Sequence, residues 1–319
     1  MKEKRISILG YLQKYGSLVA LILLVIAIGI ISPEFRTVNN FLSLLRQSSV
    51  NGFIAFGMTM VILTGGIDLS VGSILALCAA LGAGMITLMG IPVPFAMVLT
   101  LVLGLILGAV SGLLITLGRL QPFIATLVTM TVYRGITLIY TGGKPISNVT
   151  GQQYAMSSVL DFFGRGNLGK IPFPVLLFLL MFAVYYVILN KTTMGRKIYA
   201  VGSNEKCSTL AGISSNKVKF LIYSASGLMA SISALILLSR LGSAQPTLGQ
   251  GFEMDAIAAV ALGGTSMSGG RGKITGTLIG ILMIAVLDNG LNILGVSSYW
   301  QEVVKGLVIL IAVLSDKNR

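Results

Sequence analysis

Histidine is absent from this 319-residue chain, and cysteine occurs only twice. Without histidine, a histidine-based catalytic triad and a histidine-ligated metal site are both excluded. Cys78 lies within an apolar segment, where cysteine behaves as a small hydrophobic residue, and Cys207 lies in a basic stretch that we expect to face a reducing compartment. We therefore expect no disulfide, no metal centre and no cofactor.

Charged side chains are also scarce, at 10% of residues, whereas hydrophobic residues make up 55%. Soluble domains carry charge on about 25% of their residues, so this composition predicts a polytopic helical membrane protein. The net charge of +13 does not indicate nucleic-acid binding, because the basic residues are not gathered on a soluble module with interleaved aromatics. They lie in short gaps between apolar segments, where the positive-inside rule places them.

Apolar segments of about 18–20 residues cross a bilayer as helices. They predict an all-α membrane protein with about ten transmembrane helices in a single domain, residues 1–319. The predicted spans are 15–32, 50–63, 69–88, 95–117, 123–140, 173–189, 218–238, 275–294 and 300–314. One apolar piece, 256–262, is too short to cross alone. With residues from 254 onward it either crosses or re-enters while buried in protein.

The polar stretch 190–219 carries many basic residues and a single acid between two apolar segments. A basic loop between spans belongs on the cytoplasmic side. This assignment puts both termini, including residues 1–14, in the cytoplasm, and the polar stretch 142–172 outside. Residues 195–213 mix apolar and charged side chains, which is typical of an amphipathic segment that buries one side. We expect the loop 190–217 to dock a soluble partner; the alternative is a solvated charge run that only sets topology.

Two glycine-rich interruptions have similar sequences, GGIDLSVG at 65–72 and GGTSMSGG at 263–270. Glycine, glycine, serine and glycine recur there at one constant offset. Weak internal similarity with interrupted helices is typical of transporters built from two related halves. The alternative is that membrane helices are simply rich in glycine. The expected structural hinges are Gly65, Gly66, Gly263 and Gly264.

Glycines at four-residue spacing form two small-residue faces, one at 104–112 and one at 276–280. Such faces let helix backbones approach closely. We expect them to serve tight packing within one subunit, with a subunit interface as the alternative.

The stretch 269–275, GGRGKIT, resembles a phosphate-binding loop only superficially. Met267 stands where the motif needs glycine, and Ile274 stands where it needs serine or threonine. We therefore expect no nucleotide site in this chain. If ATP powers its function, the ATPase is another polypeptide.

Polar residues inside apolar segments are functional candidates, because leaving an ionised group in lipid costs several kcal/mol. Asp68 and Ser70 follow the first glycine pair, where either residue can cap a helix or contact a permeating solute. Asp288 and Asn292 share one helix face and can line a polar path. These four residues are the candidates for a translocation path.

Three other ionisable residues fall within predicted spans: Arg134, Glu302 and Lys305. Glu302 and Lys305 are three positions apart on one helix, so we expect them to neutralise each other. Intramembrane acids are too few for an ion or proton relay. The lack of histidine and of a nucleophile–base set also argues against an intramembrane enzyme.

Several stretches together resemble a known family: 49–73, 123–128, 195–206, 254–270, 276–280 and 289–301. Over about residues 17–314 the chain resembles the permeases of the carbohydrate-uptake branch of bacterial ATP-binding-cassette (ABC) importers. It is most similar to the ribose-type permeases. The block MDAIAAVALGGTSMSGG (254–270) is specific to the family, and NGLNILGVSSYWQ (289–301) is typical of its ribose-type members.

This resemblance implies a homodimeric channel in the bacterial inner membrane, a cytoplasmic ABC ATPase subunit, and a periplasmic or tethered sugar-binding protein. It also implies that 195–213 is the coupling element on which the ATPase acts. The residues matched to that element are Gly195, Arg196, Tyr199, Gly202, Asn204, Glu205, Leu210 and Gly212. Cys207 and Ser208 stand where two alanines are usual; both are small, so we expect docking to be kept.

The expected function is thus a permease that moves ribose or a similar monosaccharide through the membrane, powered by a separate ATPase. It is not an enzyme, since no bond of the sugar is made or broken. The alternatives are a permease for another pentose or hexose and an ion-coupled secondary carrier.

Overall fold

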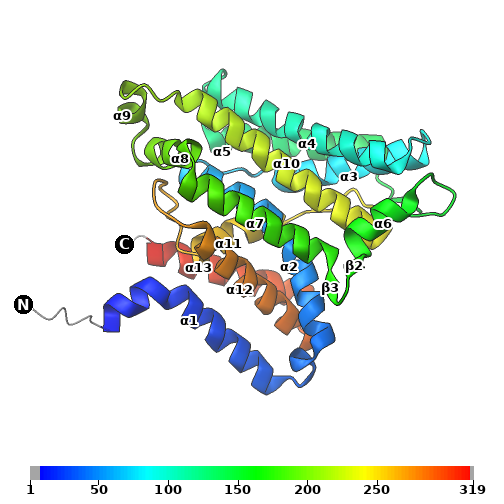
Figure 1. The fold of residues 1–319 in the computed structure, drawn as a ribbon, viewed down its shortest axis with the longest axis horizontal. Coiled ribbons are helices and arrows are strands. Elements are labelled where there is room, and N and C mark those ends of the chain that lie inside the picture. The colour runs from blue at the N-terminus through cyan, green and yellow to red at the C-terminus, as the bar shows by residue number, and fades with distance from the viewer. Residues whose placement is uncertain (1–7, 317–319) are drawn as a thin grey trace, which may run out of the picture.

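The computed structural model describes residues 8–316, which form an elongated helical bundle (Figure 1). The outer helices of the first half are α1 (Ile8–Ile31), α4 (Val93–Thr116) and α5 (Pro122–Thr141), with α2 (Val38–Leu63) and α3 (Val71–Thr87) between them. The second half contains α6 (Ser157–Arg165), α7 (Phe173–Lys191), α8 (Thr193–Ser203), α9 (Glu205–Leu210), α10 (Ser215–Leu241), α11 (Phe252–Leu262), α12 (Ile274–Ile293) and α13 (Ser298–Asp316). A 3-10 turn, Glu34–Arg36, joins α1 to α2.

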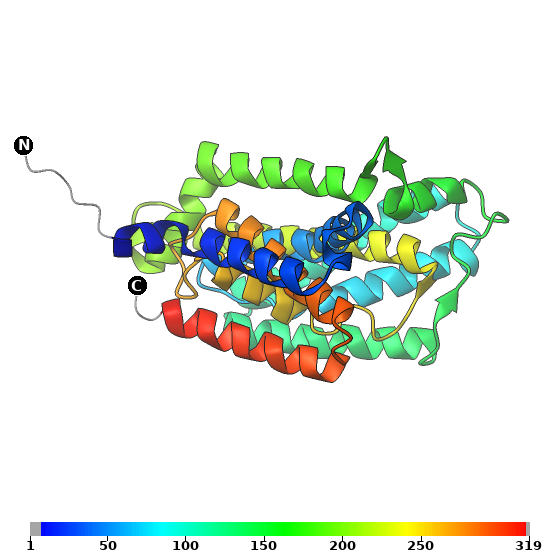
Figure 2. The same ribbon diagram turned by 90° about the horizontal axis from the view of Figure 1, so that it is seen from below.

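The core of the bundle is built from α2, α3, α10 and α11. Phe53, Ile74 and Leu238 are among its fully buried side chains. Figure 2 shows α7 along one side of this core, with α5 and α13 along the opposite side. Residues 1–7 and 317–319 lie outside the described residues, so the predicted cytoplasmic position of the N-terminal segment 1–14 is covered only from Ile8 onward.

Short strands mark one end of the bundle. β1 (Ile146–Ser147) pairs with β4 (Ser243–Ala244), and β2 (Asn167–Leu168) pairs with β3 (Ile171–Pro172), both antiparallel. These strands and α6 lie at the right of Figure 1, whereas α8, α9, the start of α1 and the end of α13 lie at the left. We call these the α6 end and the α8 end. The polar stretches 142–172 and 190–219 therefore lie at opposite ends of the bundle, as the positive-inside assignment requires.

Five helices within the described residues are long and apolar enough to cross a membrane: α4, α5, α7, α10 and α12. They match the predicted spans 95–117, 123–140, 173–189, 218–238 and 275–294 to within three residues at each end. Two further apolar helices are shorter, α3 and the part of α1 from Gly16 to Ile31. The total of ten spans stays a prediction.

Helix α2 begins well before the predicted span 50–63. Thr37 caps it, since its Oγ1 accepts a hydrogen bond from the Asn40 backbone N–H at 3.2 Å. The side chains of Asn40 and Asn289 donate to each other at 2.9 and 2.8 Å and tie α2 to α12. The prediction was too short because the first half of α2 carries several polar residues, including Asn40, whose partner Asn289 is distant in sequence.

The short apolar piece 254–264 does not return to the end from which it starts. The preceding strand β4 is paired at the α6 end, whereas the loop after α11 reaches the α8 end, where Gly270 N–H donates to the Leu63 carbonyl at 2.9 Å. Between them the chain forms consecutive turns over residues 246–251 and then the 11-residue α11. Arg134 donates to two carbonyls of the turn region, Pro246 at 2.7 Å and Leu248 at 3.0 Å, which explains a cation inside α5.

The two glycine interruptions end their helices in the same way. Gly65 (φ 79°) and Gly264 (φ 80°) both adopt the left-handed conformation that glycine accepts without penalty. Each is followed by an N–H that reaches back five residues, from Gly66 to Val61 and from Thr265 to Val260. The hydrogen-bonded positions of the second interruption lie one residue farther along the chain than the alignment of the two glycine-rich sequences predicts. The origin of the halves by duplication remains a prediction.

The small-residue faces pack within this single chain, as expected. Gly104 and Gly108 of α4 lie against Gly227 of α10, where an added methyl group would collide with backbone atoms. Gly280 of α12 lies equally close to the Ala259 carbonyl of α11. Backbone contact on this scale makes α4–α10 and α11–α12 two tightly joined helix pairs.

Candidate functional site

The basic stretch 190–219, expected to be a cytoplasmic loop with an amphipathic segment, contains two short helices, α8 and α9. Side-chain caps start each helix in turn. Thr192 Oγ1 accepts from Gly195 N–H at 3.3 Å, Asn204 Oδ1 accepts from Cys207 N–H at 3.0 Å, and Ser214 Oγ accepts from Lys217 N–H at 3.5 Å. Such caps satisfy N–H groups that have no partner within the helix. The sequence therefore specifies a helix–turn–helix unit at this end of the bundle.

The amphipathic prediction for residues 195–213 is confirmed in α8. Ile198 and Val201 are buried, while Arg196 and Lys197 on the opposite face are exposed. Tyr199 lies at the boundary, where its hydroxyl donates to the Gly272 carbonyl at 2.9 Å. Partial burial raises the pKa of this phenol, which keeps it a neutral donor.

Helix α8 lies directly against both glycine interruptions. A methyl group at Gly202 would collide with the Leu63 carbonyl oxygen and with the Gly270 amide nitrogen. Gly269, in turn, fits between the backbones of Gly65 and Gly202, with room for no side chain. A displacement of α8 thus acts on the end of α2 and on the loop 263–273 without passing through flexible side chains.

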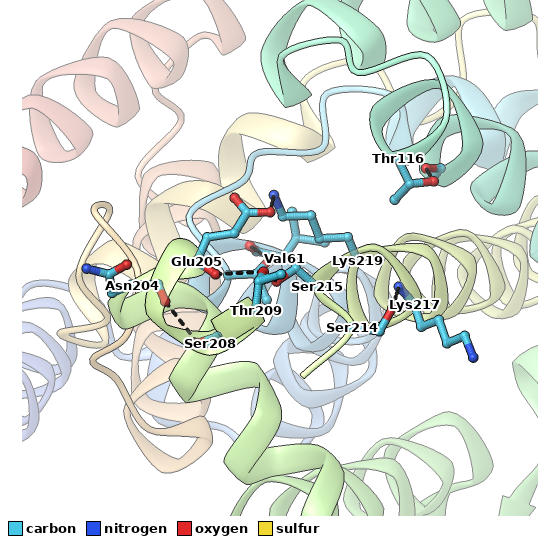
Figure 3. A network of polar contacts seen from close by, with 12 residues as sticks. Val61, Thr116, Asn204, Glu205, Ser208, Thr209, Ser214, Ser215, Lys217 and Lys219 are labelled. Carbon is cyan, nitrogen blue, oxygen red and sulfur yellow. Dashed lines mark hydrogen bonds and ion pairs between the residues drawn. The ribbon is translucent and has the colours of Figure 1, made fainter. Parts of the chain in front are cut away.

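Helix α9 is held to the start of α10 by polar contacts (Figure 3). Glu205 Oε1 lies 2.6 Å from Lys219 Nζ, and the hydroxyls of Thr209 and Ser215 lie 3.2 Å apart. Leu210 at the tip is 89% exposed. An apolar side chain so exposed at a helix end outside the bundle is suited to contact with another protein.

The structure brings all eight expected coupling residues into this one unit. Arg196, Asn204, Glu205 and Leu210 are exposed. The others support the unit: Tyr199 and Gly202 against the glycine interruptions, Gly195 against the carbonyls of Ile188 and Leu189, and Gly212 (φ 82°) in the turn before α10.

The four candidates for a translocation path do not lie together. Asp68 is fully buried, with Oδ1 accepting from Ser70 N–H at 3.0 Å and Ser70 Oγ at 2.6 Å, and Oδ2 accepting from Ser226 Oγ at 2.8 Å. Ser70 directly precedes α3, but its side chain forms no capping hydrogen bond, and Asp68 bonds Ser70 rather than an N–H of the first helical turn, so the expected capping of α3 is not observed. Both side chains are closed off from any open passage in this conformation.

Asp288 belongs to a second polar cluster, formed between α2, α11, α12 and α13. Lys305 Nζ lies 3.1 Å from Asp255 Oδ1 and 3.1 Å from Asp288 Oδ1, and Asn51 Nδ2 donates to Asp255 Oδ2 at 3.3 Å. We call Asn51, Asp255, Asp288 and Lys305 the acid–lysine cluster. Beside it is a cavity of about 10 Å³, the space of about one water molecule.

The expected pairing of Glu302 with Lys305 is wrong. Glu302 is exposed, whereas Lys305 faces inward to two buried carboxylates. The low-dielectric interior favours pairing of Lys305 with the buried acids over pairing with Glu302, because an unpaired buried carboxylate costs more free energy than an unpaired exposed one. Asp255 was missed because the predicted apolar piece began at 256, which placed this acid outside the membrane segments. Asn292 is exposed and accepts from Gln301 Nε2 at 3.1 Å.

Comparison with known proteins agrees with this architecture. Residues 40–313 match the family described as "Branched-chain amino acid transport system / permease component". The chain belongs to this family. With its apolar helices, the chain is therefore a multi-pass membrane permease.

Individual relatives align with most of the chain and give more specific comparisons than the family does. The chain is 54% identical over 318 residues to the ribose import permease protein of Bacillus subtilis, covering 100% of this chain and 97% of the relative. It is 47% identical over 312 residues to the ribose import permease protein of Escherichia coli K12, covering 97% and 95%. The xylose transport system permease protein of E. coli K12 is 34% identical over 336 residues, covering 88% and 86%. No solved structure matches the chain.

Proposed function

We propose that this chain is the membrane-spanning permease subunit of an ABC importer that carries ribose, or a similar monosaccharide, inward across the bacterial inner membrane. The observation that carries this proposal is the 54% identity along the whole chain to a ribose import permease. Both termini face the cytoplasm, and ATP is hydrolysed by a separate ABC ATPase subunit. A sugar-binding protein delivers the solute at the α6 end, and a second copy of the chain completes the channel.

The unit α8–α9 is the proposed ATPase-docking site. Its exposed residues, Arg196, Asn204, Glu205 and Leu210, provide the contact surface. Movement of this unit reaches the membrane part through Gly202 and Tyr199, which touch the end of α2 and the loop 263–273. Because α11 and α12 are in backbone contact, they respond as one body. Gly65, Gly66, Gly263 and Gly264 are the proposed hinges of this motion.

The acid–lysine cluster is the proposed polar part of the translocation path. Carboxylates, an amide and an ammonium group can together donate to and accept from sugar hydroxyls. In the described conformation Lys305 forms ion pairs with both carboxylates, and the adjoining cavity of about 10 Å³ is too small for a sugar. Passage therefore requires α13 to separate from α11 and α12. Asp68, Ser70 and Asn292 remain proposed path residues that would have to be uncovered or reached by the same movement.

Transport in reconstituted vesicles tests the function. We expect labelled ribose to accumulate only when the chain, its ATPase, the binding protein and ATP are all present. A vesicle that contains the chain and an ion gradient, but no ATPase, serves as the control. Uptake under those conditions would replace the proposal with an ion-coupled carrier.

The docking role is tested by charge reversal. Arg196→Glu should reduce ATP-driven uptake at least several-fold while membrane insertion stays normal, because Arg196 is exposed and supports no other described residue through an ion pair. Glu205→Lys also breaks the contact with Lys219, so it is compared with the exchange Glu205→Lys/Lys219→Glu. If the exchange restores uptake, Glu205 acts within the chain; if it does not, Glu205 contacts the ATPase. Normal uptake in Arg196→Glu and in both Glu205 variants contradicts the docking role.

A further inference from the structure

An apolar groove lies on the surface at the α8 end, between the last turns of α4 and the first turns of α10. Its volume is about 360 Å³, and it is open along one side. Leu113 and Leu117 form one wall, and Phe220 and Leu221 form the other. Thr116 between them bonds its hydroxyl to the Gly112 carbonyl at 2.8 Å, so it offers the groove no free donor. The walls are therefore suited to a hydrocarbon chain.

One cationic residue, Lys217, lies at the edge of this apolar groove. Asn216 and Lys217 line it from the first turn of α10, a 27-residue helix with no acidic residue in that turn. Helix N-termini attract anions through their N–H groups and the helix dipole. Lys217 is exposed and forms no ion pair with any described residue, and in Figure 3 its side chain extends away from the Glu205–Lys219 pair. The groove thus combines apolar walls with one available cation.

We propose that the groove binds an anionic phospholipid, with its phosphate at Lys217 and Asn216 and an acyl chain along Leu113, Leu117, Phe220 and Leu221. The site lies where long apolar helices meet the basic end of the bundle, which is the depth of lipid headgroups under the positive-inside rule. Basic pockets between membrane helices on the cytoplasmic side are suited to anionic headgroups. A zwitterionic lipid would place a second cation beside Lys217 and lose part of this attraction.

The bound lipid would brace α10 against α4 close to the docking unit. Lys217 lies two residues before Lys219, whose contact with Glu205 holds α9 in place. An occupied groove would therefore restrict movement of α10 at the point where α9 is attached.

Native mass spectrometry of the full chain, assembled with its ATPase, tests the proposal. The protein is taken from nanodiscs that contain equal amounts of phosphatidylglycerol and phosphatidylcholine. We expect at least one retained phosphatidylglycerol, held in several-fold preference over phosphatidylcholine. Lys217→Glu should reduce this retention several-fold, and Lys217→Arg should preserve it. Lys191→Glu is the matched control, because Lys191 is exposed at the same end of the bundle, lies outside the α8–α9 unit and does not line the groove.

Photo-crosslinking locates the lipid. A phosphatidylglycerol with a photoreactive acyl chain should label peptides that contain 113–117 or 220–221. Equal losses of retained lipid in Lys217→Glu and Lys191→Glu would reduce the effect to general surface charge and overturn the site. Equal retention of the two lipids would also overturn the site. Crosslinking that is lost only when the ATPase is assembled would overturn it as well, because the ATPase would then occupy the groove. These readouts need no transport, so the result is separate from the fate of the proposed function.

Discussion

At the scale of single residues, the packing of α13 against the bundle depends on one lysine that pairs with two carboxylates. Lys305 of α13 faces Asp255 of α11 and Asp288 of α12, and both carboxylates are at most 10% exposed. A buried ion pair adds little net stability, but removing one partner leaves an uncompensated charge. Among the described residues, Lys305 is the only basic residue in ion-pair contact with these acids. It therefore fixes α13 against the α11–α12 pair.

Lys305→Met tests this dependence. The variant leaves two carboxylates without a cation, so we expect the free energy of unfolding to fall by about 3 kcal/mol. This value is at the low end of the losses seen when one partner of a buried ion pair is removed, because Lys305 is partly exposed. The measurement is the thermal unfolding of the purified chain in detergent. The double variant Lys305→Met/Asp288→Asn should recover part of the loss, since one charge is then removed. Glu302→Gln, one turn away and exposed, is the control and should unfold like the parent; a similar loss in that variant would contradict the assignment.

At the scale of elements, the docking unit depends on its caps. Asn204 ends α8 and begins α9, and α9 has only six residues. A helix this short has too few internal hydrogen bonds to be stable in isolation. Its form comes from Asn204, from the contacts of Glu205 and Thr209 with α10, and from the turn at Gly212.

Asn204→Ala is expected to destabilise α9 by about 1 kcal/mol, because it removes the acceptor for Cys207 N–H. Backbone hydrogen exchange of residues 205–210 should become faster, while that of α10 stays the same. ATP-driven uptake should fall with it. Asn204→Ser keeps an oxygen acceptor and should restore both properties. Unchanged exchange in the alanine variant would show that contacts with α10 alone hold α9.

At the scale of the whole molecule, the bundle has two chemically different ends. The basic stretch 190–219 and both described chain ends lie at the α8 end, and the short strands lie at the α6 end (Figure 1). The positive-inside rule predicts that the α8 end faces the cytoplasm. The two native cysteines report on this arrangement, since Cys207 is exposed in α9 and Cys78 is buried in α3.

A membrane-impermeant maleimide should leave intact, outer-membrane-permeabilised cells unlabelled and should label inverted membrane vesicles at Cys207. Cys78 should stay unlabelled in both, because its thiol is fully buried. Cys207→Ser is the control for the vesicle signal. Lys144→Cys in the Cys207→Ser background should give the opposite pattern, since it lies on the 142–172 side. Labelling of native Cys207 from outside would reverse the topology.

The sequence by itself determined the class of the protein and the long apolar helices. The apolar composition indicates that the chain folds in a lipid bilayer. In that environment an apolar run of sufficient length forms a helix, because its backbone hydrogen bonds must be made within the segment. The capping residues Thr192, Asn204 and Ser214 are equally local signals. The proposed coupling residues lie within one short stretch, 195–212, so their proximity is a property of the chain itself.

Tertiary structure alone decided which distant polar groups meet. Lys305 is three residues from Glu302 but pairs with acids 50 and 17 residues earlier in the chain, because burial raises the cost of leaving those acids unpaired. Asn40 in the first half of α2 is paired with Asn289 on α12. Arg134 of α5 donates to the Pro246 and Leu248 carbonyls in the turns before α11. In each case the deciding energy is the pairing of a buried polar group, and its partner is set by packing rather than by position along the sequence.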